Sequence, residues 1–209
     1  MENLAQKLKK ARIVAVLAVN EPADSADLAK ALCDGGVTAI EMTLRTPRAF
    51  ECASAIASAG LPLTLGIGTI LTPDQAREAK SRGADFGVSP GCNVRVIDAA
   101  AEAGLPFAPG IMTPSDIEQA LEHGCRLMKF FPAESSGGMK HLQNISAPYK
   151  HLGISFIPLG GLKLSNMKSY TDSPLVTAIG GSWIAPAALI EARDWVQIRK
   201  NAEEAVANL

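Results

Sequence analysis

Residues 63–90, LTLGIGTILTPDQAREAKSRGADFGVSP, contain the pattern that decides the fold. A short apolar run is followed by Thr72-Pro73, an amphipathic stretch, Gly83 and a second apolar run that starts at Phe86. Threonine and then proline suit a helix start, because proline lacks only an amide that would have no partner there. Glycine after a helix adopts the left-handed conformation at little cost. The stretch therefore predicts a strand, a helix and a parallel strand.

The same unit recurs along the chain. We expect eight buried strands: IVAVLAV from Ile13, TAIEMTL from Thr38, LTLGIGTI from Leu63, FGVSP from Phe86, PFAPGI from Pro106, RLMKFFP from Arg126, SFIPLG from Ser155 and TAIGGS from Thr177. Helix starts are expected at Thr46-Pro47, Thr72-Pro73 and Thr113-Pro114, and helix ends at Gly35, Gly60, Gly83, Gly104 and Gly124. The segment from Ala185 to Leu209 is expected to form a closing helix.

No linker or change of composition separates these units, so residues 1–209 are predicted to form one domain. Eight consecutive units favour an α/β fold of the (β/α)₈ TIM-barrel type, with an extra N-terminal helix before the first strand. An open, doubly wound parallel sheet is the alternative. In a barrel, the active site lies at the carboxyl ends of the strands.

Composition excludes several classes of function. Apolar residues make up 47% of the chain and charged residues 20%, which is typical of a globular protein. With a net charge of −1 and no basic stripe, we expect no nucleic acid partner. No segment has the roughly twenty apolar residues that span a bilayer, and the N-terminal region lacks a cleavage site, so no membrane partner is expected. The scattered cysteines Cys33, Cys52, Cys92 and Cys125 indicate a cytoplasmic protein.

Lys129 is the most informative polar residue. It lies in LMKFFP between Met128 and Phe130, and burial there would disfavour the charged form of its amine. A neutral amine condenses with a ketone to give a Schiff base, whose cationic nitrogen accepts electrons when a neighbouring bond breaks. An ion-paired lysine at the barrel rim is the alternative. Lys163, in GGLKLS, is a weaker candidate for the same chemistry.

Glu41, in AIEMTLR, is the best candidate for a general acid or base, because its neighbours are apolar. It could instead compensate the charge of Arg45 or Lys129. Arg45 offers a guanidinium fork that suits a carboxylate, although a capping or surface role is also open. Thr69, Ser89 and Ser182 are the other polar residues in or after these strands.

Two groups of glycines follow the last two strands, Gly160-Gly161 and Gly180-Gly181 before Ser182. They occupy the usual phosphate-binding place of a barrel, where backbone amides approach an anion closely. Tight turns that need positive φ are the alternative. We expect no metal and no cofactor, since none of the histidines lies at a strand end or in a ligand-like pair (His123, His141 and His151).

The chain resembles a family over nearly its whole length. The segments that carry the resemblance are GGVTAIEMTLRT, GIGTILTP, VSPG, APGIMTP, MKFFPAESSGG, PLGG and IGGSW. They are similar to the class I aldolases for 2-dehydro-3-deoxy-6-phosphogluconate (KDPG) and 4-hydroxy-2-oxoglutarate (KHG), from the Entner–Doudoroff pathway. The resemblance implies reversible cleavage of KDPG, a 2-oxo acid phosphate, to pyruvate and glyceraldehyde 3-phosphate, and it implies a homotrimer.

The resemblance also implies residue roles. Lys129 would form the Schiff base and Glu41 would move protons. Arg45 and Thr69 would hold the substrate carboxylate, and the turn Ser89-Pro90-Gly91 would shape the pyruvate pocket. The phosphate would be received by Gly160, Gly161, Gly181 and Ser182.

One position departs from the family pattern. Leu159 stands in PLGG where the family's PTGG has a threonine, which affects the expected choice between gluconate- and galactonate-derived substrates. A KHG aldolase or a galactonate-specific aldolase is therefore an alternative. Outside this family, a phosphosugar isomerase or epimerase that uses Glu41 as a base remains open, as does a non-catalytic barrel that binds phosphorylated ligands.

Overall fold

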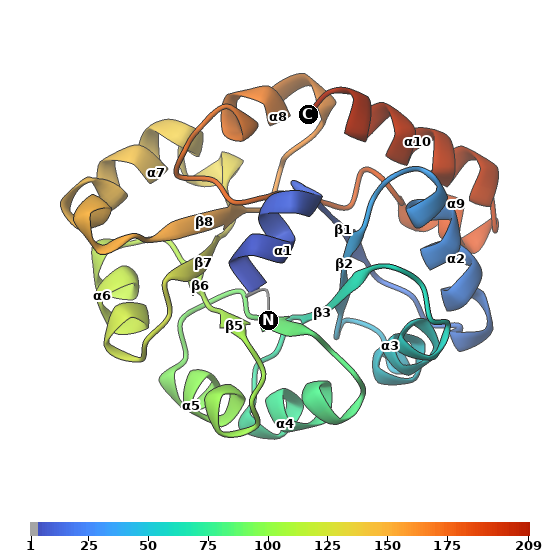
Figure 1. Ribbon diagram of the computed structural model, residues 1–209, viewed down its shortest axis with the longest axis horizontal. Helices are drawn as coiled ribbons and strands as arrows, with labels where there is room; N and C mark the ends of the chain where they lie inside the picture. Colours follow the sequence, from blue (N-terminus) through green and yellow to red (C-terminus); the bar gives the residue numbers. More distant parts are fainter. Residues whose placement is uncertain (1–3) are drawn as a thin grey trace.

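The computed structural model describes residues 4–209 as a curled parallel β-sheet ringed by helices (Figure 1). Its strands are β1 Ile13–Leu17, β2 Ala39–Thr43, β3 Thr64–Gly68, β4 Phe86–Val88, β5 Phe107–Ala108, β6 Gly110–Ile111, β7 Leu127–Phe130, β8 Ser155–Pro158 and β9 Ile179–Gly181. Its helices are α1 Leu4–Ala11, α2 Pro22–Asp34, α3 Ala49–Ser58, α4 Pro73–Ser81, α5 Val94–Glu102, α6 Pro114–Glu122, α7 Gly138–Ser146, α8 Leu164–Thr171, α9 Ala187–Glu191 and α10 Trp195–Ala207, with 3₁₀ turns η1 Glu134–Ser136 and η2 Ala147–Leu152.

All strand pairings are parallel. One sheet has the order β5-β4-β3-β2-β1-β9 and the other has β6-β7-β8. The two meet at Pro109 between β5 and β6, and isolated bridges pair Phe156 with Val176 and Leu159 with Gly180 on the other side. The architecture is thus a curled, TIM-barrel-like sheet rather than the open sheet of the alternative prediction.

Buried side chains form an inner and an outer core, because successive residues of a strand face opposite sides of the sheet. The outer core fills the space between strands and helices and includes Met128 and Phe130. The inner core lies within the curl and consists of Leu8, Val14, Val16, Ala39, Phe86, Val88, Ala108, Leu127, Ile157, Leu159 and Ala178. The two neighbours of Lys129 in sequence therefore pack against helices and not against the lysine.

Helix α1 covers the amino end of the curled sheet and appears at the centre of Figure 1. Its Leu8 is fully buried in the inner core with Ala39 and Leu127, the first residues of β2 and β7. Its Lys7 pairs with Asp85 at 3.3 Å, just before β4. The carboxyl ends of the strands, at the other end, remain accessible. No helix of residues 4–209 has the length and apolar character needed to cross a bilayer.

Most predicted helix ends are confirmed, and four details are wrong. Thr72 and Thr113 cap α4 and α6, but α3 starts after Arg48, because the Thr46 hydroxyl donates to the Val19 carbonyl instead. After α2 the left-handed residue is Gly36, with φ of 88°, and not Gly35.

The other two differences concern strand and helix continuity. The fifth predicted strand is divided into β5 and β6 at Pro109, which has no N–H to donate to a ladder. The predicted closing helix is interrupted between α9 and α10, where Arg193 has a φ of 53°.

Candidate active site

A cavity of about 370 Å³ opens at the carboxyl ends of the strands. Every residue predicted for the site lines it: Glu41, Arg45, Thr69, Pro90, Lys129, Gly160, Gly161, Gly181 and Ser182. Its wall is completed by Val16, Thr43, Phe131, Leu159 and Leu162. Residues from the ends of several strands therefore converge on one cavity.

The polar centre of the cavity is an ion pair between Lys129 and Glu41. Lys129 Nζ donates to Glu41 Oε1 at 3.0 Å, and the two side chains are only 7% and 2% exposed. Glu41 lies on β2 and Lys129 on β7, so their inward-facing positions bring them together across the curl. The charge compensation weighed as an alternative for Glu41 is present, with Lys129 as the partner, and it leaves proton transfer along the same hydrogen bond open.

Two neighbours complete the surroundings of this pair. The Phe131 ring lies 5.2 Å from Lys129 Nζ, close enough for its face to stabilise a cationic nitrogen. Gly68 at the end of β3 leaves the space that the Glu41 carboxylate occupies, because a Cβ on residue 68 would lie 2.0 Å from Glu41 Oε1. Any side chain at Gly68 would push the carboxylate away from the lysine.

Arg45 is held by Thr43, a residue that the sequence did not single out. The buried Thr43 hydroxyl donates to the Leu17 carbonyl at 2.7 Å and accepts from Arg45 Nε at 3.0 Å. One edge of the guanidinium is thereby occupied. Its outer nitrogens have no hydrogen-bond or ion-pair partner within residues 4–209, so they can bind an anion.

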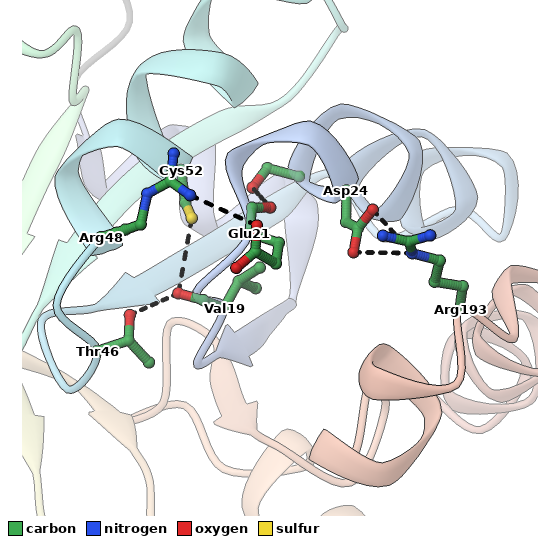
Figure 2. Close-up of polar contacts among 8 residues, drawn as sticks. Val19, Glu21, Asp24, Thr46, Arg48, Cys52 and Arg193 are labelled. Carbon is green, nitrogen blue, oxygen red and sulfur yellow. Dashed lines mark hydrogen bonds and ion pairs between the residues drawn. The ribbon is translucent and has the colours of Figure 1, made fainter.

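The loop that carries Arg45 is held by hydrogen bonds to the segment that follows β1, as Figure 2 shows. Thr46 and Cys52 both donate to the Val19 carbonyl. Beside these contacts, Arg48 pairs with Glu21 at 3.4 Å. The base of the Arg45 loop is therefore fixed against the chain that leaves β1.

Thr69 and Pro90 line the cavity next to Arg45, because they follow β3 and β4, which come after β2 in the sheet order. Thr69 has a φ of 61°, which is strained for a β-branched residue. Its conformation is imposed by the carbonyl of Gly68, which accepts from Leu44 N at 2.9 Å, and by Ile70 N, which donates to Val88 O at 3.2 Å. Such strain is found where the surrounding structure has fixed a functional side chain.

The turn at Pro90 packs directly on β6. A Cβ on Gly110 would lie 2.2 Å from the Pro90 carbonyl oxygen, so only glycine allows this approach. Within the turn, the buried Ser89 hydroxyl donates to the Gly91 carbonyl at 2.6 Å. Ser89 therefore shapes the turn that presents Pro90 to the cavity.

The glycines that follow β8 and the last glycine of β9 form the remaining wall. Gly160 and Gly161 have φ values of 95° and 83°, so the alternative interpretation, a turn that requires positive φ, also applies to them. Gly181 lies under the Trp183 ring, which a Cβ would meet at 1.7 Å. Ser182 is exposed at the rim of the same cavity.

Other candidates lie outside this cavity. Lys163 is exposed at the start of α8 and does not line it. Cys92 is also outside it, and burial raises the pKa of its thiol to about 11, so the thiol stays protonated near neutrality. Among residues 4–209, no three His, Cys, Asp or Glu side chains gather as metal ligands would.

A larger cavity, of about 630 Å³, lies at the amino end beside α1. Its lining is mostly apolar. Of its charged groups, Lys7 and Asp85 pair with each other, and Arg126 donates to the Leu152 carbonyl. It contains no counterpart of the buried Lys129–Glu41 pair. Choosing the active site by cavity volume alone would therefore have placed it at the amino end of the sheet.

Comparison with known proteins gives one consistent result. Residues 4–201 match the family model of the KDPG and KHG aldolases. The chain is 40% identical to the 2-dehydro-3-deoxy-phosphogluconate aldolase of Treponema pallidum over 95% of this chain and 93% of that protein.

Solved structures agree with the sequence relatives. A KDPG aldolase from Legionella pneumophila, with pyruvate captured as a covalent carbinolamine intermediate, is 31% identical, has a TM-score of 0.91 and covers 97% of each chain. The Zymomonas mobilis aldolase with 3-phosphoglycerate is 31% identical with a TM-score of 0.89, covering 97% of this chain and 94% of that one.

Proposed function

Because the chain belongs to the KDPG and KHG aldolase family, we propose that it is a class I aldolase that cleaves KDPG reversibly to pyruvate and glyceraldehyde 3-phosphate. The observation that carries this proposal is the buried 3.0 Å pair of Lys129 and Glu41 in a cavity at the carboxyl ends of the strands. An aldolase of this class is a carbon–carbon lyase whose lysine forms a Schiff base.

The first half of the reaction joins the substrate to Lys129. Proton transfer along the hydrogen bond to Glu41 leaves a neutral amine, which attacks the C2 ketone and gives a carbinolamine. Glu41 returns its proton to the carbinolamine hydroxyl, which departs as water. The product is a cationic Schiff base, with the Phe131 ring near its nitrogen.

The second half breaks the C3–C4 bond. Glu41 accepts the proton of the C4 hydroxyl, the C3–C4 electron pair moves toward the cationic nitrogen, and glyceraldehyde 3-phosphate leaves. The remaining enamine takes a proton at C3, and hydrolysis then releases pyruvate and restores Lys129. Each proton taken by Glu41 is returned within the cycle.

Substrate binding is assigned from the same geometry. Arg45, held at its Nε by Thr43, offers its outer nitrogens to the substrate carboxylate, together with Thr69 after the neighbouring strand β3. Pro90 limits the pyruvate end of the cavity. The phosphate is assigned to Gly160, Gly161, Gly181 and Ser182, and KDPG is therefore favoured over the phosphate-free KHG.

Four broader predictions accompany this proposal. We propose that the curled sheet is an eight-stranded (β/α)₈ barrel, with β5 and β6 counted as one strand and α1 as the extra helix. Residues 1–209 would then be one domain. The homotrimer implied by the resemblance and the cytoplasmic location indicated by the cysteines also stay predictions, and light scattering would check the first.

The deciding experiment is reduction with borohydride in the presence of pyruvate. We expect loss of activity and a reduced pyruvate adduct on Lys129, because only a Schiff base is trapped in this way. The exposed Lys163 serves as the internal control in peptide mapping, and Lys129→Ala should give no adduct. An adduct on Lys163 would contradict the assignment of the lysine.

The same experiment separates the alternative functions. An isomerase or epimerase that used Glu41 as a base would turn over without borohydride sensitivity. A non-catalytic barrel would bind phosphorylated ligands without turnover. Comparing kcat/KM for KDPG and KHG then separates the two aldolase activities.

A further inference from the structure

The loop Gly160-Gly161 is held from behind at its carbonyl groups. Gly160 O accepts from Glu134 N at 3.0 Å, and Gly161 O accepts from Asn166 Nδ2 at 3.1 Å. Glu134 lies in the segment that follows β7 and Asn166 lies in the first turn of α8. Two elements that are distant in sequence therefore hold the carbonyl side of this loop.

This attachment fixes the direction of the amides. In a trans peptide the N–H points opposite to the C=O of the same peptide group. The N–H groups of Gly161 and Leu162 therefore point away from Glu134 and Asn166. Neither donates a hydrogen bond to another group of residues 4–209, and both residues line the cavity. Two adjacent free donors of this kind suit an anion.

Side chains support the loop as well as backbone groups. A Cβ on Gly161 would lie 2.7 Å from Glu134 Cβ, so the glutamate stem packs directly beneath the loop. The Tyr170 hydroxyl donates to Glu134 Oε1, and Tyr170 itself is 1% exposed. Burial and this hydrogen bond raise the pKa of Tyr170, so it remains a donor across the physiological range. Tyr170 thus fixes the Glu134 side chain, against which the Gly160-Gly161 loop packs.

We propose that Asn166, Glu134 and Tyr170 are positioning residues that aim the Gly161 and Leu162 amides at the phosphate of the substrate. This inference rests on the proposed aldolase function. None of the three side chains lines the cavity, so they act through the loop rather than on the reacting atoms. Their effect is confined to the phosphate end of the substrate.

Asn166→Asp is the sharpest test. Asn166 Oδ1 also accepts from Lys163 N at 2.8 Å and so begins α8. Aspartate keeps that acceptor and suits a helix start, but it cannot donate to the Gly161 carbonyl and it repels that oxygen. We expect KM for KDPG to rise about tenfold while kcat stays within about twofold, since an interaction with the phosphate alone is lost.

Tyr170→Phe is the second variant, because it removes only the hydroxyl that fixes Glu134 and keeps the buried ring. It should raise KM for KDPG in the same direction. The control is Ser169→Ala, which removes an exposed hydroxyl of α8 that donates to Asn166 O. It should leave KM, kcat and the thermal midpoint at wild-type values.

Pyruvate trapping by borohydride separates a failure of this inference from a failure of the aldolase function, because pyruvate has no phosphate. We expect Asn166→Asp to be trapped at the wild-type rate. The inference is overturned if KM for KDPG is unchanged in both variants, or if pyruvate trapping slows as much as KDPG binding weakens. Failure of the wild-type protein to be trapped at all would overturn the aldolase function and this inference with it.

Discussion

Leu159 adds an apolar side chain to the cavity wall, which also includes Val16, Phe131 and Leu162. It is 4% exposed, lines the cavity and packs against Gly180, where a Cβ would lie 2.9 Å away. It has no hydroxyl to pair with a hydroxyl of the substrate. A site that hydrogen-bonds a substrate hydroxyl discriminates far more strongly than an apolar wall does.

We therefore expect the wild-type protein to prefer KDPG only weakly over its galactonate-derived C4 epimer. Leu159→Thr should sharpen the preference for KDPG by about 1–2 kcal/mol, the scale of one net hydrogen bond. The measurement is kcat/KM for both epimers. Leu159→Val is the matched control, because valine has the shape of threonine without its hydroxyl. A wild-type preference of about a thousandfold that threonine leaves unchanged would assign stereochemistry to another group.

At the scale of single elements, the end of β3 fixes the position of the Glu41 carboxylate on β2. Gly68 pairs with Thr43 in the register of these strands and lies against Glu41. Gly68→Ala should displace Glu41 Oε1 from Lys129 and slow turnover by about a hundredfold or more, as loss of a general acid–base group does. The backbone there needs no positive φ, so strain in the loop is not the cause.

A double-mutant cycle tests this mechanism. If Gly68→Ala acts by moving Glu41, it should cost little further activity once Glu41→Gln is present, because the group that it displaces is already impaired. Fully additive losses would show that the alanine damages something else. The readout is kcat for KDPG in the two single variants and the double variant.

The elements also show what local pattern can and cannot predict. Lys129 and Glu41 could be found because a charged residue inside an apolar strand is rare, and because parallel strands bring their carboxyl ends together. Thr43 was missed because its role depends on hydrogen bonds to Leu17 and Arg45, and only one of those partners is close in sequence. Asn166 was missed although it lies only five residues from Gly161, because their contact depends on the path of the loop between them.

Across the whole molecule, the two ends of the curled sheet have different tasks. At the amino end, α1 buries Leu8 in the inner core. At the carboxyl end, backbone strain at Thr69 and the buried ion pair of Lys129 and Glu41 are costs that the rest of the fold has to offset. The sheet order, the helix ring and the position of the mouth followed from the repeating βα pattern. The break at Pro109 could not be predicted from this pattern, because β5 and β6 have only two residues each and such short strands show no alternation of apolar and polar residues.

Stability of the whole molecule should fall at alkaline pH because of its thiols. Burial, and to a lesser extent Asp116, raises the pKa of Cys92 to about 11. Burial likewise raises the pKa of Cys125 to about 11, with further contributions from Cys92 and Asp98. Both ordinary values are 9.0, so above about pH 9 the unfolded chain releases protons that the folded chain retains. This contribution to stability is complete below pH 9 and is lost as the pH rises toward 11.

We expect the free energy of unfolding, measured with denaturant, to decline between pH 9 and pH 11. In the double variant Cys92→Ala, Cys125→Ala the decline should be shallower, whatever the variant loses at neutral pH through its smaller side chains. Tyr170, whose pKa is raised by burial and by Glu134, titrates in both proteins, so the difference between the two slopes isolates the thiols. Equal slopes would mean that the two thiols ionise alike in the folded and unfolded chains. In that case burial of the two thiols would not contribute to the loss of stability between pH 9 and pH 11.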